Sequence, residues 1–296
     1  MQRLIKFFIL YLISFQILCC GLKNVDLVLF SFDRPLQVYA FLESLEKYCV
    51  GLGEVHVIYR ASSQSFLEGY DIVRDRFQFA FFHQQGPDCY TNFKPLVMQY
   101  AFETPSAYVL FAVDDIVVKR NINLRACVES MEKNQAYGFY LRLGFNITEC
   151  YMQKGAKTSL PYLHDCGNDI YKFSFNQSSG DWGYPNTLDM AIYRKADIER
   201  DIKKIIFKAP NTFEGAWANL ANLKNIGLCF SESKIVNVPI NLVNEEYIDN
   251  RNMGLYSKKE LLNIFDQGLK IDIDHISSLH NSAPHMPCYL KFVARG

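Results

Sequence analysis

The sequence has no excess of either charge, since its 31 Lys and Arg residues match its 31 Asp and Glu residues. A chain that binds nucleic acid normally shows a basic excess or a basic stripe, so nucleic acid is not an expected partner. A disordered polyanion is excluded too, because hydrophobic residues make up 49% of the chain and aromatic residues 15%. Such a composition is enough to build a sizeable core.

The sequence also lacks linkers, repeats and metal-binding cysteine pairs. No Gly-, Ser- or Pro-rich stretch divides it, and no internal repeat is present. Its length suits one large α/β domain, so residues 23–296 are expected to form a single domain. None of its cysteines stands in C-x-x-C spacing, which argues against a zinc site. Apart from Cys19 and Cys20, seven cysteines remain, so at least one thiol is left unpaired within the chain.

The first 22 residues differ from the rest. Arg3 and Lys6 precede an apolar run of sixteen residues from Phe7 to Leu22. A basic start and a short apolar block are typical of a segment read by the membrane insertion machinery. The run is short for a span, which needs about twenty residues. Residues 1–22 are therefore predicted to be a cleaved signal peptide or a signal anchor that holds the chain at a membrane.

The basic N-terminal flank favours translocation of the remainder of the chain. The expected location is therefore membrane-associated or within a secretory pathway. In a eukaryotic source this would be a Golgi-type lumen. In a bacterial source it would be the cell envelope or a membrane-bound position.

Short apolar runs alternate with amphipathic stretches in the first half. The runs that predict strands are 25–32, 54–60, 78–83 and 108–113, and the stretches that predict helices are 37–48, 64–77 and 93–102. This alternation implies a Rossmann-like α/β fold with a mostly parallel central sheet and helices on both faces. The G-x-G-x-x-G fingerprint is missing, so a dinucleotide cofactor is disfavoured.

The second half is more irregular. Residues 136–146, 190–193 and 233–243 have strand character, 195–208, 212–223 and 257–267 are expected to be helical, and 153–179 is expected to form loops or short hairpins. Ser257 and Glu260 have the spacing of a capping box at a helix start.

The strongest local signal is the pair Asp114 and Asp115, directly after the apolar run 108–113. Open α/β sheets bind their ligands at the carboxyl ends of the strands. Two adjacent carboxylates repel each other, so a positive partner is expected. Mg²⁺ or Mn²⁺ would serve, and such ions commonly share their coordination shell with a substrate phosphate. The alternative is a solvated turn or a helix cap.

Two further clusters combine a carboxylate with a tryptophan. Asp181 and Trp182 lie among Gly and Pro turn residues, and Glu214 lies close to Trp217 near a helix start. Aromatic faces held in rigid turns suit sugar rings, whereas the alternative is that the tryptophans pack beneath loops. The helix dipole would stabilise an ionised Glu214, which is either catalytic or an ordinary residue of the first turns.

Three segments together resemble glycosyltransferases of the GT-A fold, in their family-2-like branch, over about residues 25–290. They are the Phe30–Pro35 opening, the strand that ends in Asp114 and Asp115, and the segment 210–215. In that fold an Asp-x-Asp motif after the fourth strand binds a metal and the diphosphate of a nucleotide sugar. The resemblance implies that Asp115 is a ligand of Mn²⁺ or Mg²⁺ and that Asp114 contacts the ribose or a metal-bound water.

The resemblance assigns further residues to the donor. Phe32, Asp33 and Arg34 would lie beside the base and the diphosphate, and Lys94 would face the phosphates. Many members of the fold use a late histidine as a metal ligand, for which His285 is preferred here over His280.

The resemblance also implies a base and an acceptor. Glu214 would deprotonate the attacking hydroxyl, with Asp181 as the second candidate. Trp182 and Trp217 would contact the acceptor, which is a hydroxyl of a glycan, a lipid or a protein. Two alternatives stay open. One is a secreted glycoside hydrolase that uses Asp181 and Glu214 without nucleotide or metal. The other is a non-catalytic carbohydrate-binding module.

Overall fold

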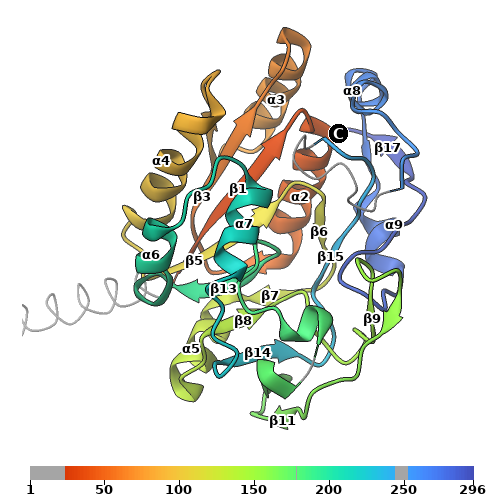
Figure 1. The fold of residues 1–296 in the computed structure, drawn as a ribbon. Coiled ribbons are helices and arrows are strands. Elements are labelled where there is room, and N and C mark those ends of the chain that lie inside the picture. Colours follow the sequence, from red (N-terminus) through yellow and green to blue (C-terminus); the bar gives the residue numbers. More distant parts are fainter. Residues whose placement is uncertain (1–23, 178, 244–252) are drawn as a thin grey trace, which may run out of the picture.

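A computed structural model describes residues 24–177, 179–243 and 253–296, so the predicted signal peptide or anchor at 1–22 lies outside the described residues. Within them, a nine-stranded central sheet has the order β11-β12-β14-β8-β13-β5-β1-β3-β4 (Figure 1). In that order the strands are His164–Asp165, Ile170–Ser174, Ile226–Phe230, Gly138–Tyr140, Ala191–Arg194, Tyr108–Val113, Val25–Phe32, Leu52–Arg60 and Ala80–Gln84.

The predicted α/β fold with a mostly parallel sheet is confirmed. Strands β1, β3, β4 and β5 pair in parallel, as the alternation of runs predicts. Only β12 and β13 run against the other seven strands of this sheet. β1 is buried from Val25 to Phe30 because both faces of the sheet are covered there, as in other parallel sheets, and its residues are apolar apart from Asp26 and Ser31.

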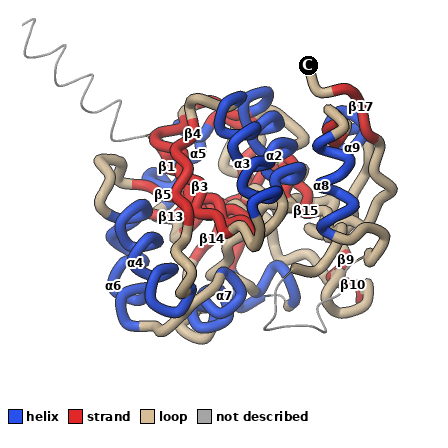
Figure 2. The backbone as a smooth tube through the Cα atoms, turned by 90° about the horizontal axis from the view of Figure 1, so that it is seen from above, coloured by secondary structure: helices blue, strands red, loops and turns tan. Residues whose placement is uncertain are grey.

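Helices cover both faces of the sheet, and each face has its own core. On one face the larger core takes in Leu27 and Leu29 of β1. Its helices are α2 (Pro35–Tyr48), α3 (Gln64–Arg76), α5 (Leu124–Asn134), α8 (Lys258–Asp266) and α9 (Ile273–Ser278). Val28 and Phe30 point to the opposite face. Its helices are α4 (Cys89–Phe102), α6 (Lys195–Lys204) and α7 (Pro210–Ala218). Figure 2 shows the two groups of helices on opposite sides of the strands.

The second core is rich in rings, and we call it the aromatic core. Its aromatic members are Phe30, Phe93, Phe111, Tyr140, Phe173, Phe175, Trp182, Tyr193, Phe207, Phe213 and Trp217. Offset and edge-on ring contacts run through it, such as the stacked pair Phe207–Phe213 at 4.3 Å between centroids. These eleven of the 43 aromatic residues thus lie in the core beneath α7.

The second half departs from the prediction in several places. The strand expected over 136–146 is only the short β8, and farther along, at Gly144, the chain passes so close to Ser233 that a Cβ would lie 2.4 Å from its backbone nitrogen. β14 lies in a stretch with no predicted element, as does α5 earlier in the chain, whereas the short hairpins expected within 153–179 are present as the antiparallel pair of β11 and β12. The capping box of Ser257 and Glu260 is confirmed at the start of α8.

Short paired strands connect the later segments to the sheet. Most relevant to the site, β15 (Ile235–Asn237) pairs with β6 (Ile116–Val118), just after β5. The remaining elements are β2 (Cys49–Val50), β7 (Ile122–Asn123), β9 (Glu149–Cys150), β10 (Ala156–Lys157), β16 (Leu269–Ile271), β17 (Phe292–Ala294), η1 (Phe175–Gln177) and η2 (Gly180–Gly183). In the described part of the chain, no helix has the length and apolar character needed to cross a bilayer.

Thiols rather than disulfides are seen where the structure describes cysteine side chains. The free cysteines are Cys49, Cys127, Cys150, Cys166, Cys229 and Cys288.

Candidate active site

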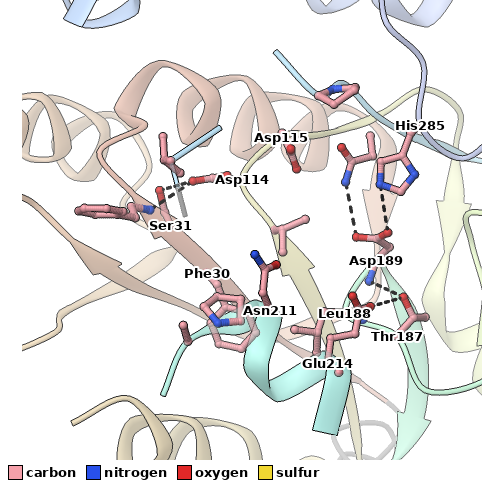
Figure 3. A pocket seen from close by; sticks show the side chains of 18 of the residues that line it. Phe30, Ser31, Asp114, Asp115, Thr187, Leu188, Asp189, Asn211, Glu214 and His285 are labelled. Carbon is pink, nitrogen blue, oxygen red and sulfur yellow. Dashed lines mark hydrogen bonds and ion pairs between the residues drawn. The ribbon is translucent and has the colours of Figure 1, made fainter. Parts of the chain in front are cut away.

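A pocket of about 870 Å³ opens at the carboxyl ends of β1 and β5, where the fold predicts a ligand site (Figure 3). It gathers residues that lie far apart in the sequence. The predicted site residues that line it are Phe32, Arg34, Asp114, Asp115, Asp181, Glu214 and His285.

Arg34 compensates the two adjacent carboxylates after β5. Its Nη1 lies 2.7 Å from Oδ1 of Asp114 and 3.6 Å from Oδ2 of Asp115. Oδ2 of Asp114 accepts a second hydrogen bond, from the hydroxyl of Ser31 at 2.7 Å. The positive partner that the acidic pair requires is thus partly supplied by the protein itself, and these contacts join the ends of β1 and β5.

The pKa of Asp115 is raised to about 6. Burial is the largest cause, Arg34 acts against it, and the neighbouring Asp114 and Asp189 add to it. Its backbone oxygen accepts a hydrogen bond from the nitrogen of Val238 at 2.7 Å. The carboxylate is therefore held in a buried, acid-rich corner that favours a further cation.

Asp189 was not among the predicted site residues. It lies between His285 and Glu214 in the pocket wall (Figure 3), with its Oδ2 3.8 Å from Nε2 of His285. Its position follows from β13, which runs antiparallel to β5 and so begins where β5 ends. The nitrogen of Met190 donates to the oxygen of Phe111 at 2.9 Å. The only sequence signal was a carboxylate just before a strand fragment.

A buried clamp fixes the segment that carries His285. Lys119 is 1% exposed, and its Nζ donates to the oxygen of Leu279 at 2.6 Å and to Oδ1 of Asn281 at 2.7 Å. A backbone bridge to Asn237 holds the segment on its other side. His285 presents its ring to the pocket, and its buried Nδ1 has no hydrogen-bond partner among the described residues.

Glu214 faces the pocket from α7. The helix begins with Pro210 at its first turn, and Phe213 and Trp217 anchor its other side in the aromatic core. Oε1 of Glu214 accepts hydrogen bonds from Oγ1 of Thr187 at 2.9 Å and from the nitrogen of Leu188 at 2.8 Å. Burial, with Asp189 adding to it, raises the pKa of Glu214 to about 7.

Arg142 and Asp181 form a buried ion pair in the pocket wall. Nη1 of Arg142 lies 2.7 Å from Oδ1 of Asp181, and Nη2 donates to the backbone oxygens of Asp181 at 3.0 Å and Tyr184 at 3.2 Å. Arg142 is only 1% exposed. This pairing holds Asp181 as the partner of a guanidinium, which disfavours its use as a free acid or base beside Glu214.

The structure does not bring Asp33 and Lys94 to the pocket. Asp33 has a positive φ of 54°, and its buried carboxylate accepts from the backbone nitrogen and hydroxyl of Ser62. Nζ of Lys94 donates to the oxygens of Lys203 and Ile205 at the end of α6. Neither side chain is thus among those that line the pocket.

Trp182 and Trp217 are likewise absent from the pocket wall. Both are 0% exposed. Nε1 of Trp182 donates to the oxygen of Ile147 at 2.9 Å, and Trp217 stacks on Phe213 with 5.7 Å between centroids. Neither ring offers an open face to a sugar, so the packing gives no support to the expected acceptor contact.

A metal site is not preformed by protein groups alone. In the described ranges, no group of three or more His, Cys, Asp or Glu side chains is arranged to hold a metal ion. A cation bound here would need ligands from elsewhere, such as phosphate oxygens of a substrate.

Comparison with known proteins agrees with the resemblance to nucleotide-sugar glycosyltransferases. The chain is similar to the bifunctional glycosyltransferase pgtA of Dictyostelium discoideum, with 26% identity across 81% of this chain and 36% of that protein. The chain thus spans little more than a third of that relative. No family model matches the sequence.

Solved structures overlap with this chain more loosely. TarS of S. aureus covers 72% of this chain and 36% of its own, with 14% identity and a TM-score of 0.46. The bifunctional glycosyltransferase WbbM covers 66% of this chain and 37% of its own, with 10% identity and a TM-score of 0.38.

Proposed function

We propose that this chain is a glycosyltransferase that moves a sugar from a nucleotide-sugar donor to a hydroxyl acceptor on a glycan, a lipid or a protein. The observation that carries the proposal is one pocket at the carboxyl ends of β1 and β5. There Arg34 and the Asp114–Asp115 pair lie on one wall and Glu214 on another. The similarity to pgtA supports the same class of reaction.

The donor fits the wall formed by the strand ends. The guanidinium carbon of Arg60 lies 3.8 Å from the ring centroid of Phe32, and both residues line the pocket. A flat aromatic and cationic surface of this kind suits a nucleotide. Arg34 and Asp115 lie farther along the same wall, which is where the diphosphate would be bound.

Asp115 and His285 are suited to hold a divalent metal together with that diphosphate. The carboxylate of Asp115 is buried beside Asp114 and Asp189, and Nδ1 of His285 lacks a partner among the described residues. Mg²⁺ is commonly bound by one or two protein ligands and substrate phosphates, so this sparse donor set fits. A bound Mg²⁺ or Mn²⁺ supplies positive charge that stabilises the departing nucleoside diphosphate.

Glu214 is proposed as the base. Its pKa of about 7 matches proton transfer near neutral pH. Thr187 and Leu188 hold one carboxylate oxygen, which leaves the other to receive a proton from the acceptor hydroxyl. As the acceptor oxygen bonds to the sugar carbon, the bond from that carbon to the diphosphate breaks and the proton passes to Glu214.

The proposal is tested by thermal shift with a panel of nucleoside diphosphates and their sugars, with and without Mn²⁺. UDP and UDP-GlcNAc are the first probes, since TarS has been crystallised with each of them. Binding to the folded state is expected to raise Tm by mass action. Asp115→Asn should lose the Mn²⁺-dependent part of the shift, whereas Asp75→Asn on the exposed face of α3 should keep it. No shift with any nucleotide would overturn the proposal.

Activity assays distinguish the proposed glycosyltransferase from the two alternatives, the glycoside hydrolase and the carbohydrate-binding module. Release of free sugar from a glycan by metal-stripped protein would favour the hydrolase. The ion pair of Asp181 with Arg142 argues against this outcome. Glycan binding without turnover on any donor would favour the carbohydrate-binding module.

A further inference from the structure

The pocket has a second wall that offers mainly hydrogen-bond acceptors. If the proposed function holds, this wall restricts the chemical class of the acceptor substrate. We call it the acceptor end and define it by Gln153, Asp181, Tyr184, Asp189 and Glu214. It meets the Arg34–Asp115 wall that is assigned to the donor at Asp189, which lies near both Asp115 and His285. An acceptor must approach from here for its hydroxyl to reach Glu214.

Carboxylates dominate the acceptor end. Asp181 and Asp189 have side chains that are 15% and 14% exposed, and Glu214 completes the group. Ionised carboxylates only accept hydrogen bonds. This wall therefore calls for a ligand that donates them.

The cations of this region are already engaged. Both terminal nitrogens of Arg142 are taken up by Asp181 and the carbonyl of Tyr184. Lys208, the remaining cation near α7 in the described part of the chain, has an interaction partner of its own. No cation of the described acceptor end is thus left to receive a carboxylate or a phosphate.

We propose that the acceptor end selects uncharged, hydroxyl-rich sugars and rejects acceptors that carry a carboxylate or phosphate beside the reacting hydroxyl. Sugar hydroxyls donate to the carboxylates that line this wall. A uronic acid replaces one of these donors with a negative charge beside Asp189 and Glu214, while Arg142 already offsets the charge of Asp181. Like charges brought together at a binding surface weaken the association.

The test measures kcat/KM for sugar transfer to pairs of aryl glycosides, each a neutral sugar and its uronic acid: glucoside with glucuronide, and galactoside with galacturonide. The neutral member of at least one pair is expected to be used about tenfold or more better than its acid. The preference should shrink as ionic strength rises, because screening weakens the repulsion. Equal use, a preference for the acids, or use of neither member would overturn the proposal.

A charge substitution makes the test sharper. Gln153→Lys places a cation at an exposed position of the acceptor end without breaking a described side-chain contact, so it should raise the relative use of the uronic acid by about tenfold. Gln267→Lys, at the end of α8, is the matched control and should leave the preference unchanged. An unchanged preference in Gln153→Lys would count against selection by charge.

A second variant exposes the buried cation. Asp181→Asn removes the carboxylate partner of Arg142, so the freed guanidinium should also favour the uronic acid in protein that still melts cooperatively. Failure here is distinguishable from failure of the proposed function. If only the acceptor proposal is wrong, the wild-type Tm still rises with nucleotide and Mn²⁺; if the function is wrong, that rise is absent.

Discussion

The buried carboxylates on the two walls of the pocket have different partners. On the strand-end wall, defined by Arg34, Asp114 and Asp115, a guanidinium lies 2.7 Å and 3.6 Å from the two acids. On the helix wall, defined by Asp189 and Glu214, neutral donors bind Glu214 and its pKa is raised to about 7. The first arrangement offsets negative charge with a guanidinium, and the second prepares a group to exchange a proton near neutral pH.

The largest expected effect is the loss of kcat when Glu214 of the helix wall is substituted. Glu214→Gln should lower kcat for transfer by about a hundredfold or more, because an amide cannot accept the hydroxyl proton. Donor binding, followed by the shift in Tm with nucleotide, should stay intact. In the wild type, kcat should fall as pH drops through about 7, since the protonated form of Glu214 is no base. Glu68→Gln on exposed α3 is the control, and equal kcat in both variants would refute the assignment.

The next largest effect is the loss of stability when Arg34 of the strand-end wall is substituted. Arg34→Met leaves the buried carboxylates of Asp114 and Asp115 without their cation, which is expected to lower the free energy of unfolding by about 3–5 kcal/mol. Urea denaturation measures this. Arg76→Met is the matched control, because Arg76 pairs with Glu46 at the surface at 2.8 Å and its loss should cost less than about 1 kcal/mol. Similar losses in both variants would contradict the contrast between the walls.

A third measurement is the pH dependence of the free energy of unfolding, which reports the ionisation of Glu214. Its pKa is raised from 4.5 in the unfolded reference to about 7 in the folded protein, so the folded state binds the proton more tightly. Ionisation therefore costs stability, which should fall as pH rises from about 4.5 to 7. The fall amounts to at most about 3 kcal/mol. Glu214→Gln should lack this component, and identical pH profiles of wild type and variant would exclude it.

The smallest effect concerns the packing beneath the helix wall. Trp182→Phe loses ring volume and the hydrogen bond to Ile147, whereas Trp217→Phe loses only volume, since Nε1 of Trp217 has no partner in the described structure. The first variant should therefore be less stable than the second by about 1 kcal/mol. Thermal or urea unfolding of the two variants checks this. The reverse order would show that cavity size matters more than the hydrogen bond.

The two walls also differ in how far the sequence predicts them. Asp114 and Asp115 follow a continuous apolar run, so their place at the carboxyl end of a buried strand could be predicted locally. The place of Asp189 could not be predicted from the local sequence. It reaches the pocket because β13 is inserted antiparallel between β5 and β8. That pairing is a contact between distant segments and leaves no periodic signal near Asp189.

Residue type alone did not predict the role of a side chain where its contacts with distant segments determine that role. Lys94 has the chemistry of a phosphate ligand but lies next to the carbonyls that end α6. Trp182 and Trp217 have the rings that suit sugars, yet the aromatic core takes up both of them. Arg142 was not predicted at all, because nothing close to it in sequence indicates its ion pair with Asp181.

The clamp of Lys119 on Asn281 has a consequence for the order in which the site is assembled. During synthesis, Arg34, Asp114 and Asp115 leave the ribosome well before His285, and β1, β3 and β5 can pair while the segment that the clamp fixes is still missing. Contacts between such distant segments form late, because the loop they close is long. A nascent chain is thus expected to have its sheet before it has a complete pocket. Activity would then appear only when the segment around Asn281 docks onto the finished domain.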